Sequence, residues 1–112
     1  MKKVFILLLM IGCVCMIGCT KEKSKLDEIL ENNNYIIVDV RTDSEYQESH
    51  VKGAINIPYD TIDENTKLDK TKTILVYCKS GVRSSKAYNT LKNLGYDAYD
   101  LGAFNSINID KE

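Results

Sequence analysis

The chain carries the segment Thr73-Ile74-Leu75-Val76-Tyr77-Cys78-Lys79-Ser80-Gly81-Val82-Arg83, in which an apolar run leads into a cysteine-containing turn. Residues 73–77 are typical of a buried strand. Residues 84–94 carry apolar side chains at helical spacing, and Gly95 follows as a C-terminal stop. Cys78 is therefore expected where a strand ends and a helix begins.

The remaining apolar runs predict a small α/β fold. A helix is expected from about Ser24 to Asn32, a short one after Thr42 or Asp43, and further strands at 35–40, 54–57 and 96–101. Residues 60–68 have only weak helical periodicity. Helices that alternate with short strands indicate a mostly parallel sheet flanked by helices, in which active sites lie beyond the carboxyl ends of the strands. Cys78 holds such a position.

The surroundings of Cys78 favour a negative charge on its sulfur. A helix N-terminus offers a positive dipole end and free backbone N–H groups, so this thiol should ionise more readily than a free thiol, whose pKa is about 8.5. Glycine permits the backbone turns of a tight cradle, and nearby cations favour an anionic substrate. The predicted cradle around Cys78 consists of Lys79, Ser80, Gly81, Val82 and Arg83.

The composition bounds the possible functions. A chain of 112 residues with 44% hydrophobic and 28% charged residues forms one soluble domain at most. A formal net charge of -1 argues against nucleic acid as a partner. His50 is the only histidine, and one histidine with one free cysteine cannot make a metal site, so we expect no metal. We also expect no cofactor and a monomer.

Residues 1–18 resemble a bacterial lipoprotein signal peptide. Lys2 and Lys3 precede an apolar run, and Gly18 directly precedes Cys19. The resemblance implies lipid on Cys19, a tether at residues 19–24 and a folded domain at residues 25–112. An uncleaved membrane anchor is the alternative, although its uncharged stretch is shorter than the roughly 20 residues that a spanning helix prefers. Either arrangement predicts a domain held at the extracytoplasmic face of the cell envelope, because basic residues before an apolar run stay inside.

The signal peptide also decides which cysteines remain. Cys13 and Cys15 would leave with the peptide and Cys19 would carry lipid, so Cys78 would be the one free thiol. A lone thiol cannot form an internal disulfide. An inert buried cysteine at the end of a strand is the alternative, and the neighbouring loop argues against it.

Two cysteine chemistries suit such a turn: phosphoryl transfer through a phosphocysteine and sulfur transfer through a persulfide. Tyrosine-phosphatase-type loops place one more residue between cysteine and arginine than the four that separate Cys78 from Arg83. Phosphatases also usually place a histidine before the cysteine, where this chain has Tyr77. The shorter loop favours a single sulfur atom over a tetrahedral phosphate.

Three motifs together resemble the single-domain rhodanese (sulfurtransferase) family over roughly residues 26–101. The segment Ile37-Val38-Asp39-Val40-Arg41, followed by Glu45-Tyr46, is similar to the family's first signature. The segment 50–58, His-Val-Lys-Gly-Ala-Ile-Asn-Ile-Pro, is similar to its second, and residues 78–84 are similar to its active-site loop. The order and spacing of the three motifs make the resemblance specific.

This resemblance implies a rhodanese-like fold and a persulfide cycle on Cys78. The sulfur would come from a small anionic donor such as thiosulfate and pass to cyanide or a thiol acceptor. Arg83 would shape the loop and Lys79 would help to bind the anion. Asp39 and Arg41 would have a structural role near the site, as a buried salt bridge or hydrogen-bonded pair.

Two alternatives remain open at this point. The same residues would serve a non-catalytic persulfide carrier or interaction module at the cell surface. A phosphatase-like or arsenate-reductase-like enzyme, which handles oxyanions with a thiol, is the other alternative, and the short loop argues against it.

Overall fold

The computed structural model describes residues 24–112 of the chain. The described residues fall into two units, one that ends at Glu31 and one that spans Asn32–Glu112. The expected signal peptide at 1–18, the lipidation site Cys19 and nearly all of the tether lie outside the described residues. None of the helices within residues 24–112 is long and apolar enough to cross a membrane.

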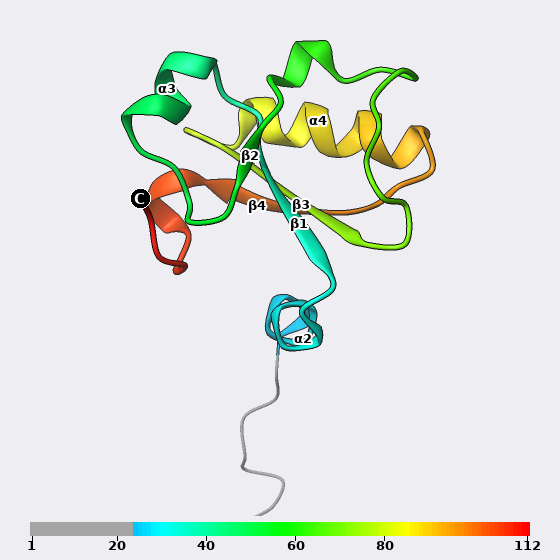
Figure 1. Cartoon of the computed structure of the whole chain (residues 1–112), viewed down its shortest axis with the longest axis horizontal. Helices are drawn as coiled ribbons and strands as arrows, with labels where there is room; N and C mark the ends of the chain where they lie inside the picture. The colour runs from blue at the N-terminus through cyan, green and yellow to red at the C-terminus, as the bar shows by residue number, and fades with distance from the viewer. Residues whose placement is uncertain (1–23) are drawn as a thin grey trace, which may run out of the picture. The chain divides into compact units, whose positions relative to one another are not determined.

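Helix α2, at Lys25–Asn32, is the described element that begins in the first unit (Figure 1). It starts as the sequence predicts, because Ser24 Oγ accepts a hydrogen bond from Asp27 N at 3.1 Å. It ends at the predicted asparagine run, where Asn33 adopts a positive φ of 54°.

The second unit is built on a four-stranded parallel sheet, which confirms the predicted fold class. Its strands are β1 (Tyr35–Asp39), β2 (Ile55–Asn56), β3 (Thr73–Cys78) and β4 (Asp97–Ala103), in the spatial order β2-β1-β3-β4. The central strands β1 and β3 are continuous apolar runs because both faces of the sheet are covered there. Pairing of β3 with β4 skips Leu101, so β4 carries an irregularity just before its carboxyl end.

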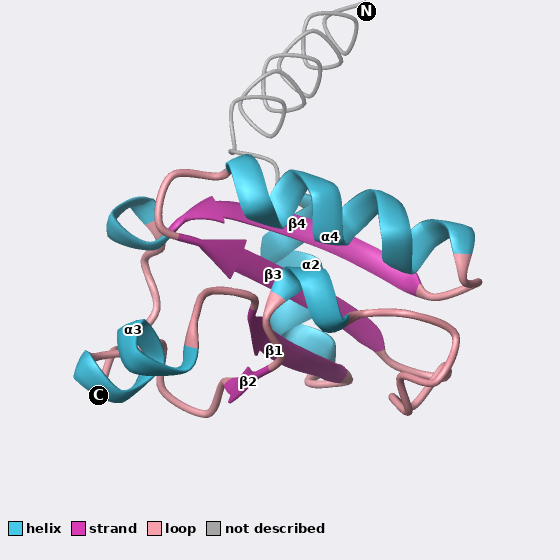
Figure 2. Cartoon of the chain, turned by 90° about the horizontal axis from the view of Figure 1, so that it is seen from above, coloured by secondary structure: helices cyan, strands magenta, loops and turns pink. Residues whose placement is uncertain are grey.

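Helix α4, at Val82–Asn93, packs against β3 and β4 (Figure 2). It begins two residues before the predicted start at Ser84. The reason is Gly81, which takes φ 100° as the N-cap and completes the turn from β3 within three residues. The core between helix and sheet contains Val38, Val40, Ile74, Val76, Ala87 and Leu91.

Short helical elements complete the second unit. They are α3 (Asp43–Glu48) and the 3-10 turns η1 (Tyr59–Thr61) and η2 (Phe104–Ser106). The weak periodicity of residues 60–68 produces only the end of η1, because the side chains of Asp63 and Thr66 bond to nearby backbone N–H groups and favour turns instead. Predicted strand 54–57 shortens to the two residues of β2.

Candidate active site

Cys78 is the last residue of β3 and has no exposed surface. Its Sγ accepts backbone N–H hydrogen bonds from Gly81 at 3.0 Å and from Ser84 at 3.3 Å. Both donors belong to the turn that starts α4, so the strand and the helix together aim N–H groups at the sulfur. A concave arrangement of amides of this kind stabilises negative charge.

Two opposing effects set the pKa of the Cys78 thiol. Burial raises it, because a charged sulfur loses hydration. Hydrogen bonds from the amide and hydroxyl of Ser84 and from the amides of Gly81 and Ser80 lower it, and together they outweigh burial. The net result is a pKa below the ordinary value for cysteine, which increases the fraction of thiolate, the reactive form.

Ser84 is a further member of the cradle, beyond the predicted residues 79–83. Its side chain is fully buried, and its hydroxyl donates to the carbonyl of Gly81 at 3.2 Å. Two features of the sequence marked it: it ends the motif at residues 78–84, and it lies in the first turn of the helix, where N–H groups lack intrahelical acceptors. The hydroxyl therefore links the two residues whose amides contact the sulfur.

The guanidinium of Arg83 forms an ion pair with the carboxylate of Glu45, so its positive charge is not free to act on the sulfur of Cys78. The two guanidinium nitrogens donate to the two carboxylate oxygens at 2.8 and 3.1 Å. Glu45 also completes the capping box of α3, accepting from Thr42 N at 3.0 Å. These contacts, the ion pair first among them, lower the pKa of Glu45 to about 2. The loop is thus fastened to α3.

Asp39 and Arg41 form the buried salt bridge behind the site, with 2.6 Å between Nη2 and Oδ2. Tyr77 donates its hydroxyl to the same Asp39 oxygen at 2.8 Å and accepts from Val51 N at 3.0 Å. Arg41 also donates to the carbonyl of Ser49 at 2.6 Å. The network satisfies its buried charges and joins β1, β3 and the loop after α3.

His50 lies in the second motif and packs against its surroundings. Its ring stacks on Tyr46, with 3.8 Å between ring centroids, and its Nδ1 lies 2.8 Å from the carbonyl of Tyr46. Its Nε2 is 3.4 Å from a carboxylate oxygen of Glu112. These contacts give the histidine a structural role. Among residues 24–112, no group of three or more His, Cys, Asp or Glu side chains is arranged to hold a metal ion.

A cavity of about 180 Å³ lies at the carboxyl ends of β1, β3 and β4, next to the cysteine loop. Its wall includes Lys79, the neighbour of Cys78, and Glu45, the residue that holds Arg83. The full lining is Arg41, Glu45, Glu48, Ser49, Lys79, Phe104 and Asn105.

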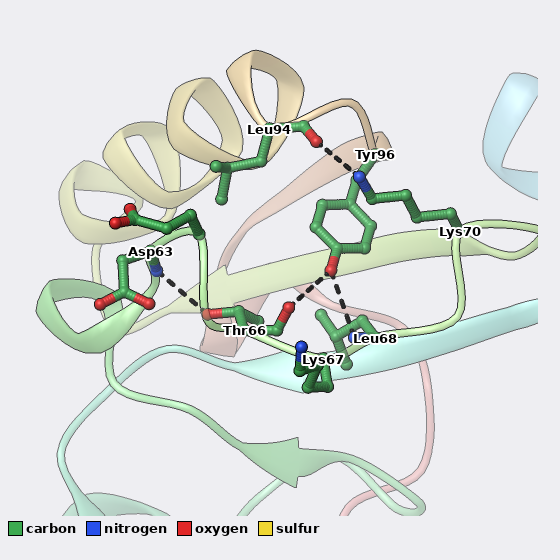
Figure 3. Close-up of a pocket in the computed structure, with 8 residues that line it drawn as sticks. Asp63, Thr66, Lys67, Leu68, Lys70, Leu94 and Tyr96 are labelled. Carbon is green, nitrogen blue, oxygen red and sulfur yellow. Dashed lines mark hydrogen bonds between the residues drawn. The ribbon is translucent and has the colours of Figure 1, made fainter.

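A larger cavity of about 380 Å³ lies between the loop that follows η1 and the end of α4 (Figure 3). Tyr96 stands in it, and its hydroxyl donates to the carbonyl of Thr66 at 2.9 Å and accepts from Leu68 N at 3.2 Å. Lys70 donates to the carbonyl of Leu94 at 2.9 Å. These polar groups fasten the loop to the helix end. Lys70 lies just before the start of β3, and Cys78 is its last residue. This cavity is therefore at the opposite end of the strands from the cysteine.

The structure brings the predicted cradle residues into one turn, with different roles. Gly81 contributes an amide N–H at the sulfur, whereas Arg83 acts through Glu45. Lys79, Ser80 and Val82 expose their side chains, Val82 to 61%. The turn therefore presents one free cation, Lys79, beside the buried sulfur.

Comparison with known proteins identifies the class. Residues 22–108 match the rhodanese-like domain family, so the chain belongs to that family. Among solved structures, a rhodanese with anions from E. coli aligns with a TM-score of 0.63 and 33% identity, over 70% of this chain and 96% of that one. A protein from Bacillus halodurans aligns with a TM-score of 0.65 and 27% identity, over 90% of this chain and 82% of that one. The parallel sheet is thus the rhodanese-like fold.

Curated relatives carry two different activities in their names. Thiosulfate sulfurtransferase PspE of Escherichia coli is 42% identical over 62 residues, 53% of this chain and 60% of that protein. The tRNA uridine(34) hydroxylase of Buchnera aphidicola is 33% identical over 90 residues, 70% of this chain and 29% of that protein. The chain therefore spans less than two thirds of the length of either relative.

Proposed function

We propose that the protein is a sulfurtransferase that carries sulfur as a persulfide on Cys78. The strongest support is the environment of the Cys78 sulfur. It accepts hydrogen bonds from the amides of Gly81 and Ser84, and the pKa of the thiol lies below the ordinary value. A thiolate is the nucleophile that attacks a sulfur–sulfur bond.

Thiosulfate is the donor that we propose. The thiolate of Cys78 attacks the outer sulfur, the sulfur–sulfur bond of thiosulfate breaks, and sulfite leaves with the bonding electrons. Lys79 is the exposed cation beside the sulfur and favours the approach of the dianion. The E. coli relative is named a thiosulfate sulfurtransferase, and this chain matches 60% of its length, which supports this donor.

The persulfide then passes its outer sulfur to an external acceptor. The described residues hold one free cysteine, so they offer no second thiol to resolve the persulfide. Cyanide and thiols are the acceptors that we propose. The cradle amides stabilise the anion that Cys78 becomes when the sulfur leaves.

We also propose that the domain is held at the extracytoplasmic face of the cell envelope through lipid on Cys19. The sequence of residues 1–19 supports this assignment. Mass spectrometry of the protein isolated from its native envelope tests it. A lipidated N-terminal cysteine supports the assignment, and an unmodified chain that starts at Met1 contradicts it.

Steady-state assays with thiosulfate and a panel of acceptors test the enzyme assignment. Many turnovers per protein molecule, absent in Cys78→Ser, support an enzyme. Loading of one sulfur with no turnover on any acceptor supports the carrier alternative. Hydrolysis of phosphate esters that depends on Cys78 would favour the oxyanion enzyme instead.

A further inference from the structure

The cavity of about 180 Å³ beside the cysteine loop contains polar groups in two different situations. Three are engaged within the protein: Arg41 pairs with Asp39, Glu45 pairs with Arg83, and Ser49 donates to the carbonyl of Glu112 at 3.3 Å. The ring of Phe104 lies 4.5 Å from the guanidinium carbon of Arg41 and closes one wall.

The other polar side chains of the cavity are Glu48, Lys79 and Asn105. Within the described part of the chain, none of the three makes a side-chain hydrogen bond or salt bridge, and Glu48 and Lys79 do not pair with each other. One carboxylate, one ammonium and one amide are therefore available to a molecule in the cavity. Such a set complements a ligand that carries both an ammonium and a carboxylate.

We propose that this cavity binds the sulfur acceptor and that the acceptor is a small amino-acid thiol, with its ammonium at Glu48 and its carboxylate at Lys79 and Asn105. This inference rests on the proposed sulfur transfer. The cavity has a volume of about 180 Å³, which is large enough for a free amino acid.

The position of Lys79 connects this binding site to the chemistry. Lys79 directly follows Cys78, and the outer sulfur of a persulfide extends about 2 Å beyond Sγ. The acceptor thiol loses its proton to solvent and attacks that outer sulfur. The sulfur–sulfur bond to Cys78 breaks, its electron pair returns to Sγ, and the acceptor leaves as a persulfide. No net oxidant or reductant is needed.

The test measures discharge separately from loading. Cys78 is first loaded with thiosulfate or polysulfide, and intact mass confirms the added sulfur before any acceptor is present. Excess donor is then removed, and cysteine, cysteamine or 3-mercaptopropionate is added. Each discharge rate is divided by the rate of the same thiol with a small soluble disulfide, which corrects for thiol reactivity. If no sulfur is added at the loading step, the proposed function fails and this inference fails with it, whereas normal loading followed by unselective discharge overturns this inference alone.

We expect cysteine to discharge the persulfide up to about fivefold faster than either thiol that lacks one of its charges, because an exposed ion pair contributes up to about 1 kcal/mol. Glu48→Gln should slow cysteine and cysteamine but not 3-mercaptopropionate. Lys79→Gln should slow cysteine and 3-mercaptopropionate but not cysteamine. Glu64→Gln and Lys67→Gln, at the other cavity, are the matched controls and should change no rate. Equal corrected rates for the three thiols, or variants that slow all of them alike, would overturn the proposal.

Discussion

Arg83 and Glu45 are joined by two hydrogen bonds, of 2.8 and 3.1 Å, that cross from the first turn of α4 to α3. Arg83, at the end of the cysteine loop, therefore shapes the loop by binding Glu45 of α3. Its charge is largely matched by the carboxylate, so the sulfur is stabilised mainly by amides.

Replacing Glu45 should loosen the cysteine loop. Glu45→Gln keeps a side chain that can complete the capping box of α3 but removes the ion pair, and should cost up to about 1 kcal/mol in the free energy of unfolding. Glu45→Ala removes both interactions and should cost roughly 0.5–1 kcal/mol more. Urea unfolding measures both losses. Amide hydrogen exchange at Gly81 should be faster in both variants, and unchanged exchange there would contradict the role of the pair.

The same pair predicts an acid dependence of stability. The pKa of Glu45 is lowered from 4.5 to about 2 in the folded protein, mainly by Arg83. A lowered pKa stabilises the fold above the unfolded value, and this contribution is lost as the pH falls through the folded value. The difference in unfolding free energy between wild type and Glu45→Gln should therefore be constant near neutral pH and shrink between about pH 4.5 and pH 2. A difference that does not change over this range would be inconsistent with the pair.

The Ser84 hydroxyl should influence the ionisation of Cys78. Ser84→Ala removes the hydroxyl, which lowers the pKa of the Cys78 thiol, while leaving the backbone N–H in place, and should therefore raise that pKa. Ser84→Thr retains a hydroxyl and should restore most of the effect. Thiolate absorbance followed against pH measures the pKa, and a wild-type thiol that titrates like free cysteine would refute the cradle.

Gly81 should be required for the cradle beyond its effect on stability. Gly81 and Gly53 both have positive φ, 100° and 85°, so alanine at either position should cost about 1 to 2 kcal/mol. Only Gly81 donates its N–H to Cys78, so only Gly81→Ala should also slow sulfur loading. Urea unfolding and loading kinetics compare the two variants, and equal loading rates would count against the cradle.

The parallel sheet could be predicted because its signals are local. The apolar runs of β1 and β3 and the helical spacing of α4 each lie within a few residues of one another, and the structure confirms all three. The start of α4 was missed by two residues because the left-handed turn at Gly81 depends on how β3 meets the helix.

The partners of the site were harder to predict. The Thr42–Glu45 capping box is a local pattern, but Glu45 stands 38 residues from Arg83, and nothing local marks that contact. Ser84 was placed in the active-site loop by the resemblance but was not predicted to contact the sulfur. Its complete burial depends on the packing of α4 against the sheet.

Intact mass of the purified domain after exposure to thiosulfate tests the central claim most directly. We expect the mass to rise by one sulfur atom, the added sulfur to map to Cys78, and a reducing thiol to remove it. Cys78→Ser should gain nothing, and Cys78 is the one free cysteine among the described residues. A wild-type domain that stays at its original mass with thiosulfate and with polysulfide would contradict the account.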